Sequence, residues 1–374
     1  MALKAADGKD VFLSGPIELK AGITLLVDTG VTVFASRDPR LYEVSPGSCG
    51  LVNESGRGCR PLIHVKDAPH AAVMGDGVID GRGGSKLLGR SVSWWDLAEE
   101  ARRAGRQNCP RLIVAEHADD FTLYRITLHN SPNFHVVVSE TNGFTAWGVK
   151  IYSPARGARN ADGIDPISTS NVSILHCSIH AGDDNVALKA GSSGPVRHVT
   201  VAHDHFYAGH GMSIGSETDG GVSDVDVHDL TIDGADNGLR IKSNSTRGGL
   251  VERVTFSDVC IRNVKYPIVV DPFYSTERGD KPPEFRDITF RNVRILTPGR
   301  IRLKGIDSQH LSHVTFDGVV MAEAQPSYIE AKFLSLTFGA GETNIFPWGA
   351  DVVLGRKEGK RKVASCEGAF APFP

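Results

Sequence analysis

The 374-residue sequence lacks several features that mark particular classes of protein. No stretch approaches the roughly 18 consecutive apolar residues of a membrane-spanning helix. Neither sign of charge is in excess, since 41 Lys and Arg oppose 44 Asp and Glu, so a basic nucleic-acid-binding surface is not expected. The opening residues, MALKAADGKD, contain no apolar core of a secretory signal peptide. These absences predict a globular chain with neither a membrane nor a nucleic-acid partner.

The six cysteines include no Cys-x-x-Cys pair, which argues against a zinc knuckle or a thioredoxin-like site. Cys49 and Cys59 bracket a glycine-rich segment that can close as a small disulfide loop or remain reduced. Cys177 is expected to be a buried small hydrophobe. Glycine is abundant instead, at 41 of 374 residues or about 11%, against a usual value near 7%. A chain with this much glycine is expected to turn often.

An eight-residue pattern recurs along the chain, hydrophobic at its first, third, sixth and eighth positions. The copies begin at Phe121, Phe144, Val172, Val199, Val225, Val254, Ile288 and Val314. Each copy contains two short alternating runs, which indicate strands, with polar residues between them that invert the inward face. Only Asp204 and, mildly, Ala146 depart from the pattern. The spacing of 23 to 34 residues is typical of one solenoid coil.

A third β-branched run follows several copies after a turn that contains Gly or Asn. These runs read FHVVVS, NVALKA, GMSIGS, GLRIKS and PIVVDP. Three strands per coil predict an all-β protein, a right-handed parallel β-helix of roughly ten coils with three to four strands each. A β-sandwich with accidental regularity is the alternative, while the repeats of leucine-rich and propeller proteins are absent.

We expect a single domain over residues 1–374, because the repeat runs through most of the chain. Residues 91–106 form the only convincing helix and are expected to lie in an excursion from the coils. The repeat is lost in the last part of the chain. Residues 330–374 are therefore expected to form a C-terminal cover over the exposed end of the solenoid.

Three acidic side chains recur at near-coil spacing, in NADGID at 160–165 and GDDN at 182–185. Because neighbouring coils lie about 4.8 Å apart, Asp162, Asp183 and Asp184 should place their carboxylates roughly 5 to 10 Å apart, a range that overlaps that of an inverting glycosidase. Like charges at that distance can leave one carboxyl protonated as a general acid. Turns closed by aspartate side chains are the alternative use of the same residues.

Cationic and aromatic side chains follow on later coils. Arg240 and Lys242 point the same way from one strand, which suits an acidic substrate, whereas a solvated surface pair is the alternative. Tyr274 lies a further coil along and could stack on or bond to a sugar. His210 lies between two glycines in GHG. The glycines expected to let a sugar approach the backbone are Gly163, Gly182, Gly209 and Gly211.

A metal site is not expected. His198, His203 and His205 are close in sequence, but strand alternation sends neighbouring residues to opposite faces, and no carboxylate completes a familiar ligand set. We therefore expect neither a metal nor another cofactor.

Taken together and in this order, NADGID, GDDNVALKAG, GHGMSIGSET and GLRIKS closely resemble the polygalacturonases of glycoside hydrolase family 28. The segment GDGVIDGRG at 75–83, followed by Trp94 and Trp95, is also similar to that family. The resemblance spans about residues 12–330. It implies a right-handed parallel β-helix and metal-independent, inverting hydrolysis of α-1,4-linked galacturonic acid in pectin.

The resemblance also implies a role for each matched catalytic residue. Asp183 is similar to the general acid that protonates the departing glycosidic oxygen. Asp162 and Asp184 correspond to the carboxylates that position and deprotonate the attacking water. His210 matches the active-site histidine, which tunes the acid or holds the sugar.

Four further residues are assigned to substrate binding by the same resemblance. Arg240 and Lys242 match the cations that grip the galacturonate carboxylate next to the scissile bond, and Tyr274 resembles the tyrosine of that subsite. Asn160, the first residue of NADGID, completes the set.

The sequence departs from the family at two positions that carry no catalytic group. Ala161 replaces a frequent threonine and Asn185 a frequent cysteine, and the stretch around them resembles bacterial members. The N-terminal strand and secretion signal of the family are shortened or absent. We therefore expect secretion on the basis of the family resemblance alone.

Several alternatives remain open at this point. Modest loops and the lack of a large appended domain favour an open cleft and endo cleavage of polygalacturonate or pectin by a monomer. An exo-acting enzyme is the alternative, followed by a rhamnogalacturonan or xylogalacturonan hydrolase, a calcium-dependent pectate lyase, and a carbohydrate-binding solenoid without catalysis.

Overall fold

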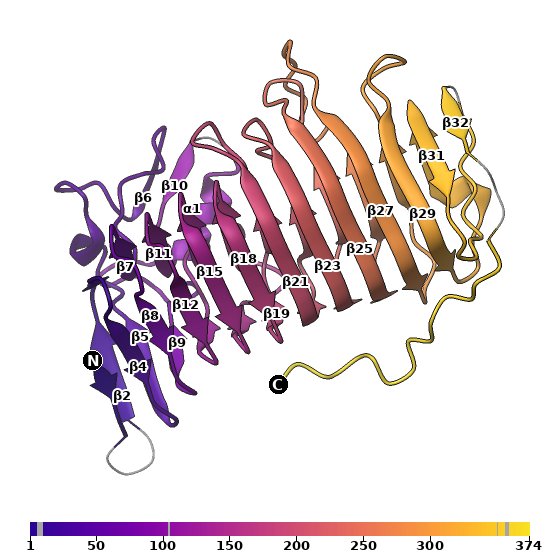
Figure 1. Cartoon of the computed structure of the whole chain (residues 1–374). Coiled ribbons are helices and arrows are strands. Elements are labelled where there is room, and N and C mark those ends of the chain that lie inside the picture. Colours follow the sequence, from indigo (N-terminus) through magenta and orange to yellow (C-terminus); the bar gives the residue numbers. More distant parts are fainter. Residues whose placement is uncertain (6–9, 104, 350, 356–358) are drawn as a thin grey trace. The chain divides into compact units, whose positions relative to one another are not determined.

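The structure is a computed structural model that describes residues 1–5, 10–103, 105–349, 351–355 and 359–374. The chain divides into two compact units. The first comprises Met1–Pro166, Cys177–Val186 and the last residue, Pro374, and the second comprises Ile167–His176 and Ala187–Phe373. In each unit, most strands pair in parallel with strands one coil away, as the ribbons in Figure 1 show.

The first unit contains three stacks of parallel strands. The first stack consists of β1 (Ala2–Leu3), β4 (Thr24–Val27), β8 (Ala72–Met74), β12 (Phe121–Tyr124) and β15 (Asn142–Trp147). The second consists of β2 (Asp10–Ser14), β5 (Val31–Ala35), β9 (Val78–Asp80), β13 (Thr127–His129), β16 (Lys150–Tyr152) and β19 (Ser178–His180). The third consists of β3 (Ile17–Leu19), β7 (Ile63–Lys66), β11 (Ile113–Glu116), β14 (Val136–Ser139), β17 (Ile164–Ile167) and β20 (Asp184–Leu188).

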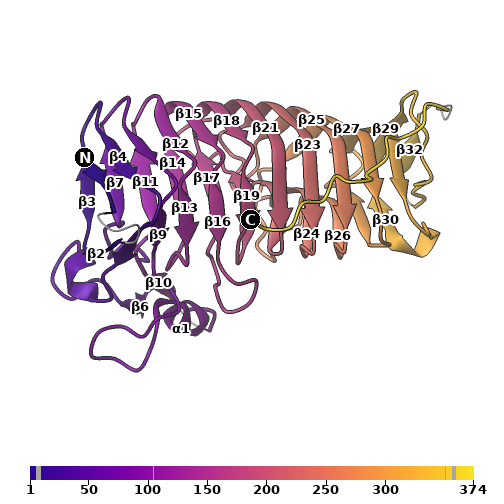
Figure 2. The ribbon, with the colours of Figure 1, turned by 90° about the horizontal axis from the view of Figure 1, so that it is seen from below.

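An excursion leaves the stacks of the first unit, as Figure 2 shows. It contains the 3₁₀ turn η1 (Pro39–Tyr42), the antiparallel pair β6 (Leu51–Asn53) and β10 (Arg106–Asn108), and helix α1 (Trp94–Glu100). The helix predicted over 91–106 is too long. It begins at a capping box between Ser93 and Asp96 and ends before the chain pairs with β6. No helix among the described residues is long and apolar enough to cross a membrane.

The second unit contains one stack of long strands and one of short strands. The long stack consists of β18 (Ser170–Leu175), β21 (Val196–Tyr207), β23 (Val222–Asp233), β25 (Leu250–Arg262), β27 (Glu284–Ile295), β29 (Ser312–Met321), β31 (Leu334–Phe338) and β32 (Val352–Leu354). The short stack consists of β22 (His210–Ile214), β24 (Asn237–Lys242), β26 (Tyr266–Asp271), β28 (Ile301–Lys304) and β30 (Ile329–Lys332), which follows the 3₁₀ turn η2 (Pro326–Tyr328).

The eight-residue repeat of the sequence coincides with the register of the strands. The first residue of one copy pairs with the first residue of the next, as in Val199 with Val225 and Val254 with Ile288. All four repeat positions of every copy are at most 2% exposed, and even Asp204 is fully buried. These side chains form the core, so the prediction of a right-handed parallel β-helix is confirmed.

A single residue with left-handed backbone produces the bend inside each copy of the repeat. The fifth position has a φ between 50° and 92° in all eight copies, at Arg125, Gly148, His176, His203, Asp229, Asp258, Asn292 and Gly318. Only two of these residues are glycine. The other six are polar, as the sequence pattern indicated, and residues such as Asn and Asp tolerate the left-handed region. Many other glycines do adopt positive φ elsewhere in the chain.

Two disulfides are present among the described residues. Of the two states that the sequence left open for Cys49 and Cys59, the structure has the disulfide, and Cys177 is a buried free thiol as expected. Nothing in the sequence pattern indicated the second bond, which joins Cys260 of β25 to Cys366. It fastens a C-terminal tail that Figure 2 shows running past the strands of the second unit.

Further contacts hold this tail, which follows the β30–β32 continuation of the stacks. Arg294 donates hydrogen bonds to the Val363 and Ala364 carbonyls at 2.6 and 2.8 Å, and the Tyr207 hydroxyl donates to the Ala371 carbonyl at 3.1 Å. The proposed cover over the end of the solenoid by residues 330–374 stays a prediction.

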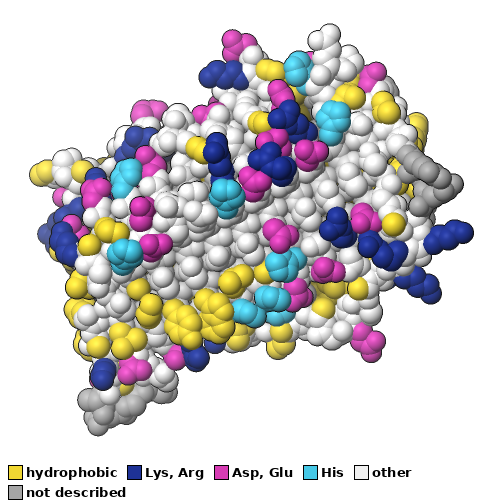
Figure 3. Space-filling model, in the orientation of Figure 1, with side chains coloured by type: hydrophobic (Ala, Val, Ile, Leu, Met, Phe, Trp, Pro, Cys, Tyr) yellow, Lys and Arg dark blue, Asp and Glu magenta, His cyan; other side chains and the backbone are white. Residues whose placement is uncertain are grey.

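The outer faces of both units carry ion pairs and ring contacts between coils. Acidic, basic and histidine side chains gather on the face drawn in Figure 3. In the second unit they form ion pairs between coils, such as Arg253 Nε to Asp224 Oδ1 at 2.7 Å and Arg262 Nη2 to Asp233 Oδ2 at 2.7 Å. In the first unit, Tyr124 stacks on Trp147 with 5.2 Å between ring centroids. The surface ion pairs add little stability, because solvent screens exposed charges.

Candidate active site

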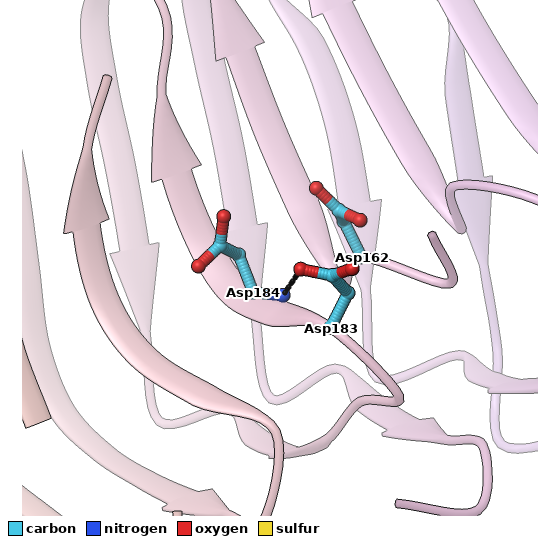
Figure 4. Close-up of side chains that lie close together, drawn as sticks. All are labelled: Asp162, Asp183 and Asp184. Carbon is cyan, nitrogen blue, oxygen red and sulfur yellow. Dashed lines mark hydrogen bonds between the residues drawn. The ribbon is translucent and has the colours of Figure 1, made fainter. Parts of the chain in front are cut away.

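Three aspartates of the first unit form a compact carboxylate cluster, shown in Figure 4. Asp162 precedes β17, and Asp183 and Asp184 lie at the start of β20. One carboxylate oxygen from each lies within 4.8 Å of the others. Asp162 and Asp184 are 3% and 2% exposed, whereas Asp183 is partly exposed. The structure therefore brings together all three aspartates that the sequence predicted, with Asp183 the most accessible to a ligand.

The carboxylates lie closer together than the 5 to 10 Å that coil spacing predicts. Asp183 Oδ1 accepts a hydrogen bond of 3.0 Å from the Asp184 backbone N–H, which turns its side chain back toward the chain. The prediction of 5 to 10 Å used only the spacing of the backbones and did not include the direction of each side chain. Because the nearest oxygens fall below the range of about 6.5 to 9.5 Å typical of inverting glycosidases, the separation alone does not predict the stereochemical outcome.

Glycines around the cluster permit close packing of the coils. A Cβ atom on Gly163 would lie 2.3 Å from the Asn185 carbonyl oxygen, and one on Gly182 would lie 2.3 Å from the Ala158 carbonyl oxygen. The Gly163 N–H also donates to the Asp184 carbonyl at 2.8 Å. The prediction that these glycines serve the approach of a sugar is therefore wrong, since the neighbouring coil occupies the space.

A glycine beside His210 in the second unit is packed in the same way against the neighbouring coil. A Cβ atom on Gly211 would lie 2.6 Å from the Gly238 carbonyl oxygen, so Gly211 also packs against the protein. Gly209 adopts a φ of 53° in the turn before β22.

A buried histidine that sequence reasoning missed supports the first aspartate. His135 is fully buried, and its Nδ1 lies 2.8 Å from the Asp162 carbonyl oxygen. Its Nε2 lies 3.2 Å from the Ser153 hydroxyl. Desolvation lowers the pKa of His135 to about 4, so the neutral ring donates through Nδ1 and accepts at Nε2. His135 thus positions the backbone of Asp162. Its only signal in the sequence was a histidine at the start of the apolar run FHVVVS.

Two predicted cations lie on β24 of the second unit. Arg240 and Lys242 are only 7% and 5% exposed, which excludes the alternative of a solvated surface pair. Arg240 Nε donates to the Ser213 hydroxyl at 3.0 Å, and Ser213 is its register partner on β22. A charged side chain is rarely buried so deeply unless it has a partner or a ligand.

His210 and Tyr274 also lie in the second unit. His210 Nδ1 accepts a hydrogen bond of 3.0 Å from the Asn237 side-chain amide, which leaves the proton of a neutral ring on Nε2. Lys242 Nζ lies 4.9 Å from the centre of the Tyr274 ring, a cation–π contact. Tyr274 is 50% exposed. Its ring is therefore available to a sugar as well as to the lysine.

The carboxylate cluster is the one group of described residues whose donor atoms are close enough to hold a metal ion. Carboxylate oxygens are ligands that both Ca²⁺ and Mg²⁺ accept, with water completing their coordination. Among the histidines considered for a metal, His203 Nδ1 contacts Asp229 and His205 Nδ1 lies 2.6 Å from the Thr231 hydroxyl. These contacts give each ring a partner within the protein. The expectation of a metal-free site stays a prediction.

Clustered carboxylates with different exposure are suited to acid–base catalysis. Like charges this close repel one another, which favours a proton shared within the cluster. One carboxyl can then donate a proton while another accepts one, as glycoside hydrolysis requires.

Comparison with known proteins supports that chemistry. The family model described as glycosyl hydrolases family 28 matches residues 6–336. An endo-polygalacturonase of Pectobacterium carotovorum subsp. carotovorum is 45% identical over 317 residues, which cover 84% of this chain and 78% of that protein. A polygalacturonase of Ralstonia nicotianae is 38% identical, covering 99% of this chain and 81% of that protein.

Solved structures agree on the fold. The polygalacturonase from Erwinia carotovora is 40% identical, with a TM-score of 0.76 over 94% of this chain and 86% of that one. An exopolygalacturonase from Thermotoga maritima has a TM-score of 0.74 at 24% identity, covering 93% of this chain and 83% of that one, and shows the fold alone. With the family model matched over most of its length and its predicted aspartates gathered in one cluster, the chain belongs to glycosyl hydrolases family 28.

Proposed function

We propose that the protein is an endo-polygalacturonase, which hydrolyses α-1,4-galacturonosyl linkages in polygalacturonate and pectin. The observation that carries the proposal is the carboxylate cluster, three aspartates within 4.8 Å at positions that match the motifs of a family of glycoside hydrolases. Membership of this family favours hydrolysis over the lyase and the non-catalytic solenoid. The relatives named for endo action are 45% identical to this chain.

The reaction follows from the differences among the three carboxyls. Asp183, partly exposed, gives its proton to the glycosidic oxygen as the C1–O bond breaks. Asp162 and Asp184 take a proton from the water that attacks the anomeric carbon. Inversion follows when water attacks the face opposite the leaving group. This outcome rests on membership of the family, because the carboxylate separation alone does not predict it.

The second unit supplies groups that suit an acidic sugar. Arg240 and Lys242 would pair with the carboxylate of the galacturonate next to the scissile bond, since buried cations interact strongly with a desolvated anion. Tyr274 would stack on the same sugar, and His210 Nε2 would donate to it. Asn160 would bind the substrate from the first unit. No metal or other cofactor enters this reaction.

Export and organisation are part of the same proposal. Two disulfides are typical of proteins that fold in an oxidising compartment, which supports secretion. We propose that the whole chain acts as one catalytic domain and as a monomer.

Product analysis tests the proposal. Purified protein incubated with polygalacturonate in EDTA should release reducing ends without the ultraviolet absorbance of unsaturated products, and early chromatograms should contain a ladder of oligomers. Monomer or dimer alone would indicate exo action. Ultraviolet-absorbing products that vanish in EDTA would indicate a calcium-dependent lyase and overturn the proposal.

A further inference from the structure

One peptide group of the first unit connects the backbones of two of the clustered aspartates. It lies between Asp162 and Gly163, and it forms hydrogen bonds to the coils on both sides. Its N–H donates to the Asp184 carbonyl at 2.8 Å, and its carbonyl accepts from the His135 backbone N–H at 2.8 Å. The direction of this peptide group therefore sets where the Asp162 carboxylate stands relative to that of Asp184, which Figure 4 shows beside it.

The side chain of His135 adds a second hydrogen bond to the same carbonyl. Its Nδ1 lies 2.8 Å from the Asp162 carbonyl oxygen. Parallel strands are held together by backbone hydrogen bonds alone, so the ring is not needed to pair the coils. Its bond acts on a residue that precedes β17 and carries one of the clustered carboxylates.

The surroundings of the His135 ring match one neutral tautomer. A carbonyl oxygen only accepts hydrogen bonds, so Nδ1 carries the proton. On the other side of the ring, the Ser131 backbone N–H only donates, and it lies 3.4 Å from Nε2. The Ser153 hydroxyl lies 3.2 Å from the same nitrogen and can also donate to it. All three residues are fully buried, so bulk water does not compete for these contacts.

This arrangement fixes the ring and, through the ring, the backbone of Asp162. We infer that His135 is a positioning residue for catalysis, which holds the Asp162 carboxylate at the angle that receives a proton from the attacking water. The inference rests on the proposed function, in which Asp162 and Asp184 activate that water. Its effect should appear in kcat, since a displacement of about 1 Å at a reacting group can cost about 100-fold in rate. KM should not change, because the binding cations lie on β24 of the second unit.

Two amide variants distinguish the two ring nitrogens. The amide nitrogen of asparagine is as many bonds from Cβ as Nδ1 of histidine, and that of glutamine is as many as Nε2. His135→Asn therefore keeps a donor for the Asp162 carbonyl, whereas His135→Gln does not. On polygalacturonate, kcat of His135→Gln should fall about 100-fold. The kcat of His135→Asn should stay within about threefold of that of the unmodified protein, and both variants should keep its KM.

Val138→Ala is the matched control for a loss of stability. Val138 is fully buried in β14, the strand that His135 precedes, and its truncation leaves the His135 ring in place. Melting temperatures measure the stability of each variant, and kinetics are compared where all of them are folded. Val138→Ala should keep the original kcat although its melting temperature falls. Equal losses of kcat in the two amide variants, or an effect confined to KM, would overturn the inference.

A spectroscopic measurement on the unmodified protein serves if the glutamine variant does not fold. Histidine-selective nitrogen NMR identifies which ring nitrogen of His135 carries the proton. A proton on Nδ1 is expected while the enzyme is active, and a proton on Nε2 would overturn the inference. An unmodified protein that releases no reducing ends from polygalacturonate would instead contradict the proposed function, and the tautomer measurement does not depend on turnover.

Discussion

The carboxylate cluster of the first unit and the cationic strand of the second unit use the β-helix differently. The aspartates stand at the turns that enter β17 and β20, and one of them stays partly exposed. Arg240 and Lys242 lie two residues apart on β24, so they share one face of the strand, and both are almost fully buried. Turn positions let carboxylates approach one another and exchange protons with a ligand, whereas strand positions hold charges in fixed directions. The turns are therefore suited to the chemistry and the strand to substrate binding.

The largest expected effect on activity comes from changing an aspartate at the turns. Asp183→Asn should lower kcat by about 10⁴-fold, since an amide cannot donate the proton that the leaving oxygen needs. The circular dichroism spectrum and melting temperature should match those of the unmodified protein, because asparagine has nearly the same volume and the carboxyl of Asp183 is partly exposed. A kcat within tenfold of the original would break the assignment of catalysis to the turns.

The disulfides allow the stability of the two units to be compared. Cys260–Cys366 closes a loop of 106 residues in the second unit, and Cys49–Cys59 closes one of 10 in the first. Loop-closure entropy predicts losses of about 5 kcal/mol and about 3 kcal/mol when each pair is replaced by serine. Denaturant unfolding of the two double-serine variants measures both values. Equal losses of unfolding free energy would show that loop length does not determine how much each disulfide stabilises the protein.

Protonation should destabilise the first unit through His135. Desolvation lowers the pKa of His135 from 6.5 to about 4, so between these values the unfolded chain binds a proton that the folded chain does not. Unfolding free energy should therefore fall as the pH drops from 6.5 to 4, by about 3 kcal/mol for this group.

Two other histidines should act in the same direction. Desolvation also lowers the pKa of His129 in the first unit and of His205 in the second, because each ring loses part of its solvent on folding. Chemical unfolding at pH 4, 5 and 6.5 measures the combined slope. Stability that stays flat or increases on acidification would contradict the sign.

The smallest expected effect on activity comes from removing a ring that contacts the cationic strand. Tyr274→Ala removes the ring that lies 4.9 Å from Lys242 Nζ and should raise KM for polygalacturonate about fivefold, or ~1 kcal/mol, with kcat nearly unchanged. Tyr274→Phe keeps the ring face and is the matched control. A loss of kcat comparable to that of Asp183→Asn would place Tyr274 with the catalytic groups and remove the division between turns and strand.

Much of the fold could be predicted because the coil repeats. Every inward position of the eight copies is buried, and the repeat spacing coincides with the strand register. The bounds of α1 and the Cys260–Cys366 bond could not be predicted in the same way. Both depend on a contact that forms once, between β10 and β6 or between the tail and β25, and a single contact leaves no periodic signal.

The residues of the candidate site likewise fall into those that the sequence predicts and those that it does not. Asp162, Asp183 and Asp184 could be predicted because coil spacing converts sequence distance into proximity. His135 could not, since it acts through the backbone carbonyl of Asp162 and resembles any other residue of a buried strand. The roles of Gly163 and Gly182 were misjudged for a related reason, because only the folded chain brings up the neighbouring carbonyl that excludes a Cβ atom.

The sequence by itself determined the coil, the inward-facing residues and the types of side chain at each turn, because these follow from local alternation repeated many times. Only the tertiary structure decided how close the carboxylates lie and which cations are buried. These properties depend on side-chain direction and on segments that meet from distant parts of the chain, which local periodicity does not encode.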